Sequence, residues 1–175
     1  GGDRTVTVTA GTYGENVTVN KAMTLQGMGG TSIIDGTGRN GHGITVAASD
    51  VTLDGLVTQN FVNSYVADDY TASGIFVNSA ITNLTLNEML TRNNAAGFYV
   101  SKMASINGLD IDDSQFNNNN FGFYTEKNMT LGTTDTSPRW RSWQLLPWTR
   151  TLCTTLDANT ARTLVCDHSF CTIRT

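Results

Sequence analysis

Short runs in which apolar and polar residues alternate recur throughout residues 1–132. Alternation at every second position is typical of a β-strand with one buried face. One set of runs shares a common form, at residues 16–19, 43–46, 74–77, 97–100 and 122–125. A second strand-like run follows each of these, at residues 23–25, 51–53, 84–86, 109–111 and 129–131. A weaker third element occupies residues 56–57 and 89–90 in the middle repeats, and Gly- and Asn-rich turns separate the runs.

The repeat predicts a solenoid of parallel strands. Successive runs of the first set begin 27, 31, 23 and 25 residues apart, and no segment between them is long or periodic enough for a crossover helix. Parallel strands without helices stack coil upon coil at about 4.8 Å. We therefore expect an all-β parallel β-helix of five to six coils over residues 1–132.

The opening segments resemble a known superfamily. Residues 6–13 (VTVTAGTY), 15–19 (ENVTV) and 23–27 (MTLQG) look like the first coils of the right-handed parallel β-helices of the pectate-lyase-like superfamily. The resemblance covers about residues 3–132 and implies a right-handed solenoid. That superfamily includes polysaccharide lyases, pectin esterases, alginate epimerases, phage tailspikes and repeats with no known chemistry. The Gln-Asp-Thr-Leu segment of the esterases and the Asp-Pro-His motif of the epimerases do not occur in the sequence.

The composition changes abruptly near residue 132. Every Gly lies at or before that position, whereas both Pro, all three Trp and all three Cys follow it. Residues 1–132 carry six basic and twelve acidic side chains, and residues 133–175 carry five and three. We therefore predict two regions: a β-helix over 1–132, and an irregular, partly helical C-terminal cap or appended non-repeat tail over 133–175.

The charge and the hydropathy pattern exclude two classes of partner. The net charge of −4 leaves no basic stripe for nucleic acid. No apolar run approaches the ~18–20 residues of a membrane span. The chain starts Gly-Gly with neither a basic nor an apolar leader, so a signal peptide is not present in it. From the superfamily resemblance we expect a secreted or cell-surface protein.

An aromatic column is the first candidate site. Alternation places Ile44, Val46, Ile75, Val77, Phe98, Val100 and Phe123 inward, and the residues between them outward. Phe76, Tyr99 and Tyr124 then occupy successive rungs of one outward column. Such a strip is suited either to stacking on sugar rings or to being covered by protein in an interface.

An acidic group is the second candidate site. Outward positions after the second run form columns, one of which contains Gln26, Asp54, Asn87 and Asp112, with Asp110 in the next column and Glu88 and Asp113 at the corner. Carboxylates one rung apart raise one another's pKa unless a cation lies among them. We consider either a solvated acidic face or a calcium site made by Asp54, Glu88, Asp110 and Asp112. The superfamily resemblance implies Arg92 as the candidate base of a calcium-dependent lyase.

Two further features of the repeat bear on function. The insertion 61–73 interrupts the repeat and carries Asp68, Asp69 and Tyr70, which form either a functional loop or a plain surface loop. His42, between Gly41 and Gly43, is interpreted as a turn residue rather than a base. Three consecutive Asn positions of the repeat, Asn60, Asn93 and Asn118, are expected to form an internal or turn ladder.

The tail has its own signals. Pro138 and the spacing of Trp140, Trp143 and Leu146 predict a short amphipathic helix over 138–146, which would cap the open end of the solenoid. Cys153, Cys166 and Cys171 form a weak zinc pattern, and one disulfide with one remaining thiol is favoured, with the pairing open.

The sequence therefore leaves three functional hypotheses. The leading one is a secreted, non-catalytic module for carbohydrate contact, surface display or self-assembly, without a cofactor. The second is a calcium-dependent polysaccharide lyase or a related carbohydrate-active enzyme. The third is a truncated β-helix fragment whose tail or aromatic strip drives homo-oligomer formation.

Overall fold

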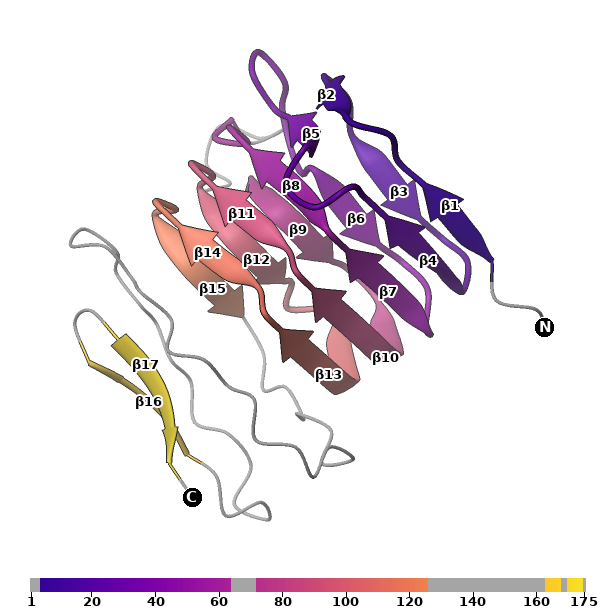
Figure 1. The fold of residues 1–175 in the computed structure, drawn as a ribbon. Coiled ribbons are helices and arrows are strands. Elements are labelled where there is room, and N and C mark those ends of the chain that lie inside the picture. The colour runs from indigo at the N-terminus through magenta and orange to yellow at the C-terminus, as the bar shows by residue number, and fades with distance from the viewer. Residues whose placement is uncertain (1–3, 64–71, 126–162, 168–169, 175) are drawn as a thin grey trace.

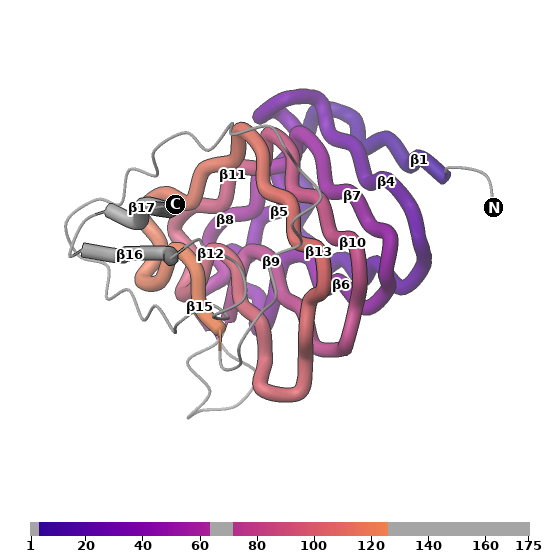
Figure 2. The backbone as a smooth tube through the Cα atoms, turned by 90° about the horizontal axis from the view of Figure 1, so that it is seen from below, coloured from indigo at the N-terminus to yellow at the C-terminus, as the bar shows by residue number. Residues whose placement is uncertain are grey.

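The computed structural model describes residues 4–63 and 72–125, together with the backbone of residues 163–167 and 170–174. Within these ranges the chain forms strands and turns and contains no helix. The expected all-β parallel solenoid is confirmed. Figure 1 shows the strands running in layers, and Figure 2 shows the coils stacked in chain order from β1 to β15.

Three parallel sheets form the sides of the solenoid. Sheet A contains β1 (Thr5–Thr7), β4 (Met23–Gln26), β7 (Val51–Asp54), β10 (Ala80–Asn87) and β13 (Ser105–Asp112). Sheet B contains β2 (Gly11–Tyr13), β5 (Ser32–Asp35), β8 (Leu56–Gln59), β11 (Leu90–Arg92) and β14 (Gln115–Asn117). Sheet C contains β3 (Val17–Val19), β6 (Ile44–Val46), β9 (Ser73–Val77), β12 (Ala96–Val100) and β15 (Phe121–Thr125).

The number of coils is smaller than expected. The path from β1 to β13 makes about four turns, instead of the predicted five to six. The first residue of the register column on sheet A is Thr5, and its in-register partners are Thr24, Thr52, Thr85 and Asp110. The insertion 61–73 lengthens the turn from Thr52 to Thr85 to 33 residues, whereas the turn from Thr5 to Thr24 takes only 19. The predicted strand at 129–131 lies outside the described residues.

Alternation within the strands builds a continuous apolar core. The predicted inward residues of sheet C from Ile44 to Val100 are fully buried, and Phe123 packs against the core at the last described rung. The inward residues of sheet A that continue this core are Leu25, Leu53, Leu86 and Ile111. In-register pairing of like side chains therefore supplies the burial that stabilises each coil on the next.

Three columns of left-handed residues bend every middle coil in the same places. All non-Gly residues with positive φ in the described chain fall in these columns, which are Asp50–Asn83–Gly108, Gly55–Glu88–Asp113 and Asn60–Asn93–Asn118. Asn, Asp and Gly tolerate this conformation best. Glu88 and Asp113 thus lie at the corner between sheets A and B, as predicted.

The Asn ladder lies partly one residue from its predicted position. Asn60, Asn93 and Asn118 form the turn column, with φ of 64°, 56° and 54°, but the buried ladder is made by the next residues. The Asn94 backbone N–H donates to Asn119 Oδ1 at 2.9 Å, and the Phe61 backbone N–H donates to Asn94 Oδ1 at 3.0 Å. A bend at the left-handed residue turns the following side chain inward, which period-2 alternation alone does not predict.

Phe61 replaces Asn at the previous rung of this ladder, and two glycines make room for its ring. A Cβ on Gly36 would lie 2.6 Å from Phe61 Cδ1, and one on Gly43 would lie 2.7 Å from Cε2. Phe61 is fully buried as a result.

The C-terminal region contributes a separate two-stranded antiparallel sheet of β16 (Thr163–Asp167) and β17 (Phe170–Arg174). Its backbone register places Cys166 opposite Cys171. The predicted helix over 138–146, Cys153 and the loop residues Asp68, Asp69 and Tyr70 lie outside the described residues.

Candidate functional site

The aromatic residues form one column on the outer face of sheet C, as predicted. Parallel pairing aligns Thr18, Thr45, Phe76, Tyr99 and Tyr124 across β3, β6, β9, β12 and β15. The ring centroids of Phe76 and Tyr99 lie 5.0 Å apart with an interplanar angle of 23°, and those of Tyr99 and Tyr124 lie 5.2 Å apart at 31°. Strand spacing and ring stacking therefore share nearly the same period.

The faces of these rings are occupied by one another. Tyr99 stacks on Phe76 on one side and on Tyr124 on the other, and only 6% of its surface is exposed. Phe121 lies beside Tyr124, with ring centroids 5.3 Å apart. A sugar ring stacks on an aromatic face, so the middle of this column offers it ring edges rather than faces.

His42 extends the aromatic column by one rung. It lies in the turn before β6, as the flanking glycines predicted, but its ring also stacks on Phe76, with centroids 3.8 Å apart and an angle of 15°. Its Nδ1 lies at hydrogen-bond distance, 2.9 Å, from Ser73 Oγ. The strand pattern does not predict this contact, because the ring belongs to a turn, and the strand residue in register with Phe76 is Thr45, which has no ring.

The environment of His42 alters its protonation. Burial lowers the pKa of His42 from 6.5 to about 4, because the charged imidazolium loses solvation against the ring of Phe76 and the surrounding chain. At neutral pH the side chain is therefore an uncharged member of the stack.

A polar ladder runs along the outer face of sheet A. The register aligns Thr7, Gln26, Asp54, Asn87 and Asp112 across all five strands. Gln26 Nε2 donates to Asp54 Oδ2 at 3.0 Å, and Asn87 Nδ2 donates to Asp54 Oδ1 at 2.8 Å. The amide of Asn87 thus separates the carboxylates of Asp54 and Asp112, which lie two rungs, or about 10 Å, apart.

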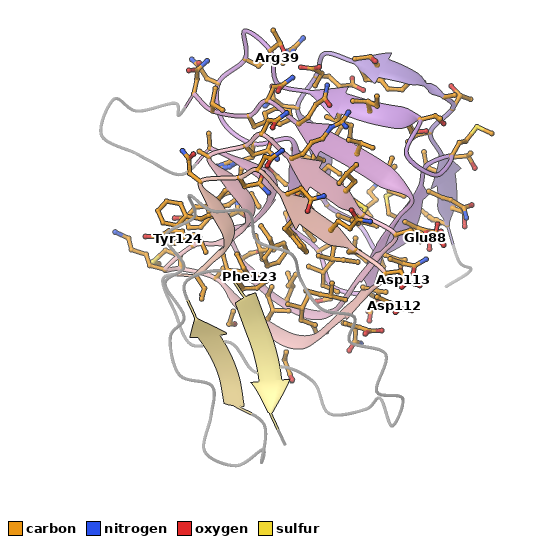
Figure 3. All side chains as sticks on the ribbon, turned by 60° about the vertical axis from the view of Figure 1, so that its left-hand side comes forward. Arg39, Glu88, Asp112, Asp113, Phe123 and Tyr124 are labelled. Atoms are coloured by element: carbon orange, nitrogen blue, oxygen red, sulfur yellow. The ribbon has the colours of Figure 1, made fainter. Side chains whose placement is uncertain are left out.

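The four residues of the predicted calcium group occupy three different columns. Asp54 and Asp112 belong to the ladder just described, Asp110 lies in the column of Thr5, Thr24, Thr52 and Thr85, and Glu88 lies at the corner. Figure 3 shows Glu88, Asp112 and Asp113 gathered at one corner of the solenoid, away from Tyr124. Among residues 4–63 and 72–125, no three acidic, His or Cys side chains are arranged to hold a metal ion. The calcium site stays a prediction.

Arg92 lies on sheet B and not beside the acidic group. Its Nε donates to Gln59 Oε1 at 2.9 Å, and Gln59 Nε2 donates to Asp35 Oδ2 at 2.7 Å. The three residues are in-register neighbours in β11, β8 and β5. Because the corner residue Glu88 turns the chain between β10 and β11, closeness in sequence to Asn87 does not bring Arg92 onto the same face.

Asp35 ends this second ladder as a carboxylate. Partial burial raises its pKa, but hydrogen bonds from the side chain and backbone of Thr37 and from Gln59 and Asn60 outweigh that effect and lower it to about 2. Asp35 is therefore a fixed acceptor in the ladder.

Comparison of the chain with protein family models, with curated proteins and with solved structures gives no match. In the part of the chain that the structure describes, no helix is long and apolar enough to cross a membrane. The parallel solenoid is established by the structure, and the closer likeness to the pectate-lyase-like superfamily stays a prediction.

Proposed function

We propose that this protein is a secreted or cell-surface, non-catalytic solenoid module that binds a linear polysaccharide along the outer face of sheet A. The observation that carries the proposal is a pair of adjacent polar columns on that sheet. One column is Thr5, Thr24, Thr52, Thr85 and Asp110, and the other is Thr7, Gln26, Asp54, Asn87 and Asp112.

The columns have the chemistry that a hydroxyl-rich polymer requires. Thr hydroxyls donate and accept hydrogen bonds, the amides do both, and the carboxylates accept. Each type recurs at intervals of one or two strands, so a repeating ligand meets similar partners along its length. Gln26 and Asn87 hold the Asp54 carboxylate in place before any ligand binds, which lowers the entropic cost of binding.

The charge of this face favours a neutral polymer. Asp54, Asp110 and Asp112 all lie on it, and a polyuronate would bring further carboxylates against them. Like charges repel unless a cation bridges them. We therefore expect neutral glycans to bind better than polygalacturonate or alginate in calcium-free buffer.

The placement of the candidate lyase residues supports a non-catalytic role. Arg92 belongs to the sheet B ladder with Gln59, whereas the acidic group belongs to sheet A and its corner. General acid–base chemistry needs its groups within hydrogen-bond reach of one substrate.

Affinity electrophoresis and pull-down of the full chain with cellulose, xylan, polygalacturonate and alginate test the proposal. The double variant T24V/T52V removes two hydroxyls from sheet A and keeps β-branched side chains. We expect its affinity for the retained neutral polymer to fall about tenfold, since each hydrogen bond contributes roughly 0.5–1.5 kcal/mol.

The matched control is T18V/T45V, which makes the same change in an outward column of sheet C. If both variants lose the same affinity, the polymer does not bind at sheet A. If the unmodified chain binds none of the four polymers, the proposal is rejected. Release of unsaturated product from polygalacturonate with calcium would instead support the lyase alternative.

A further inference from the structure

The sequence contains three Asn-X-Thr tripeptides, the acceptor pattern for N-linked glycans. They are Asn16-Val17-Thr18, Asn83-Leu84-Thr85 and Asn128-Met129-Thr130, of which the last lies outside the described residues. An acceptor Asn must leave room for a sugar on its amide nitrogen in the folded protein. The two described tripeptides differ in this respect.

Asn16 is exposed, but both of its amide hydrogens are used in bonds to the next coil. Its Nδ2 donates to the backbone oxygen of His42 at 2.7 Å and to that of Asn40 at 3.1 Å, one coil further along. A sugar on Nδ2 would replace one hydrogen and so remove one of these two bonds between the coils. It would also release the turn that positions His42 on Phe76.

Asn83 is also exposed but makes fewer hydrogen bonds. It lies at the left-handed bend of β10, and within the described residues its Nδ2 donates a single hydrogen bond, to Asp50 Oδ1 at 2.7 Å. The in-register neighbour on the other side is Gly108, where an added Cβ would lie 3.1 Å from Asn83 Oδ1. Gly108 therefore places no side chain against the Asn83 carboxamide.

We propose that Asn83 is an N-glycan attachment site and that Asn16 is not one in the folded protein. In the reaction, the Asn83 amide nitrogen attacks the anomeric carbon of an isoprenoid-diphosphate-linked oligosaccharide. A C–N bond forms, the bond from that carbon to the diphosphate oxygen breaks, the diphosphate leaves with the electron pair, and the amide nitrogen loses one proton. The remaining N–H still donates to Asp50, so the linkage is held at the bend.

This inference rests on the secretion proposed above but not on polysaccharide binding by sheet A. The test is expression of the full chain, with a secretion signal and an added terminal acceptor tripeptide, in a eukaryotic host. A glycan-removing amidase converts each modified Asn to Asp, and peptide mass spectrometry then reports occupancy site by site. We expect the folded, secreted protein to be modified at Asn83, with occupancy at Asn16 at least tenfold lower.

Variants at Thr85 separate glycan transfer from folding. T85S keeps the hydroxyl that the acceptor pattern requires and should retain the glycan, whereas T85V should lose it, with the same circular dichroism spectrum. An unmodified Asn83 in a chain whose added acceptor is modified would overturn the proposal, and so would equal occupancy at Asn16 and Asn83. If little protein is secreted, the intracellular membrane fraction still decides the assignment of Asn83: an unmodified Asn83 beside a modified added acceptor overturns it.

Discussion

The aromatic column of sheet C and the polar column of sheet A have the same in-register geometry, but they differ in how much of their binding capacity the neighbouring rungs occupy. Each ring in the middle of the aromatic column has two faces, and its neighbours on the adjacent rungs occupy both. A carboxylate has about four acceptor positions, of which Asp54 uses two for Gln26 and Asn87. A parallel stack therefore closes an aromatic column upon itself, whereas it leaves a polar column with binding capacity toward solvent.

Removing a ring from the middle of the aromatic column should have the largest effect. In Y99A, two stacking contacts are lost and a buried cavity forms, so we expect the free energy of unfolding to fall by about 3–5 kcal/mol. Urea denaturation measures it. T52A, on the polar face, should cost less than about 1 kcal/mol, and an equal cost for the two variants would contradict the comparison.

Burial, rather than polarity, should decide what a polar column contributes to stability. N94A removes the acceptor of the Phe61 backbone N–H inside the solenoid and should cost about 3 kcal/mol. N87A removes a donor to Asp54 on the outer face and should cost less than about 1 kcal/mol. The same urea titration compares them, and a larger loss for N87A would be the contrary result.

Acid should weaken the aromatic column through His42. Its pKa is about 4 in the folded chain and 6.5 as the reference for the unfolded chain, so the unfolded state binds a proton first as the pH falls. Stability is complete above pH 6.5 and declines down to about pH 4, by at most about 3 kcal/mol. H42F keeps a ring over Phe76 and should remove this part of the pH dependence of the urea midpoint. An unchanged pH profile in H42F would exclude His42 as its source.

The smallest effect is expected at Asp35. Its folded pKa of about 2 lies below the reference value of 3.8, so its contribution to stability is present above pH 3.8 and is lost as the pH falls toward 2. Because the carboxylate is solvent-accessible, screening keeps this contribution well below about 1 kcal/mol. D35N should reduce the pH dependence of the melting temperature only between about pH 2 and pH 3.8. Thermal denaturation between pH 2 and pH 5 measures it. A change near neutral pH would contradict this assignment.

The sequence predicted the columns because strand alternation and in-register pairing are both local rules. Asn87 between Asp54 and Asp112, and Tyr99 between Phe76 and Tyr124, follow directly from counting by two within a repeat. The rules stop at the corners. There, a left-handed residue changes the direction of the chain. Arg92 therefore lies on sheet B instead of beside the acidic group, and the buried Asn ladder contains Asn94 instead of Asn93.

The sequence pattern also does not predict the contacts that turn residues make. His42 was correctly predicted in a turn, yet its ring lies on Phe76, 34 positions further along the chain. Such a contact depends on the length and path of the turn rather than on a repeat. The same holds for Phe61, whose burial needs the space left by Gly36 and Gly43.

The three columns of left-handed corner residues also have an evolutionary consequence. Since each middle coil turns at equivalent positions, a coil is an interchangeable unit whose ends meet its neighbours in the same way. Stability in such arrays is approximately a sum over units and their interfaces. A duplication that copies one full coil, from one corner residue to its in-register partner, would lengthen the molecule and extend the sheet A face by one rung without rebuilding any turn.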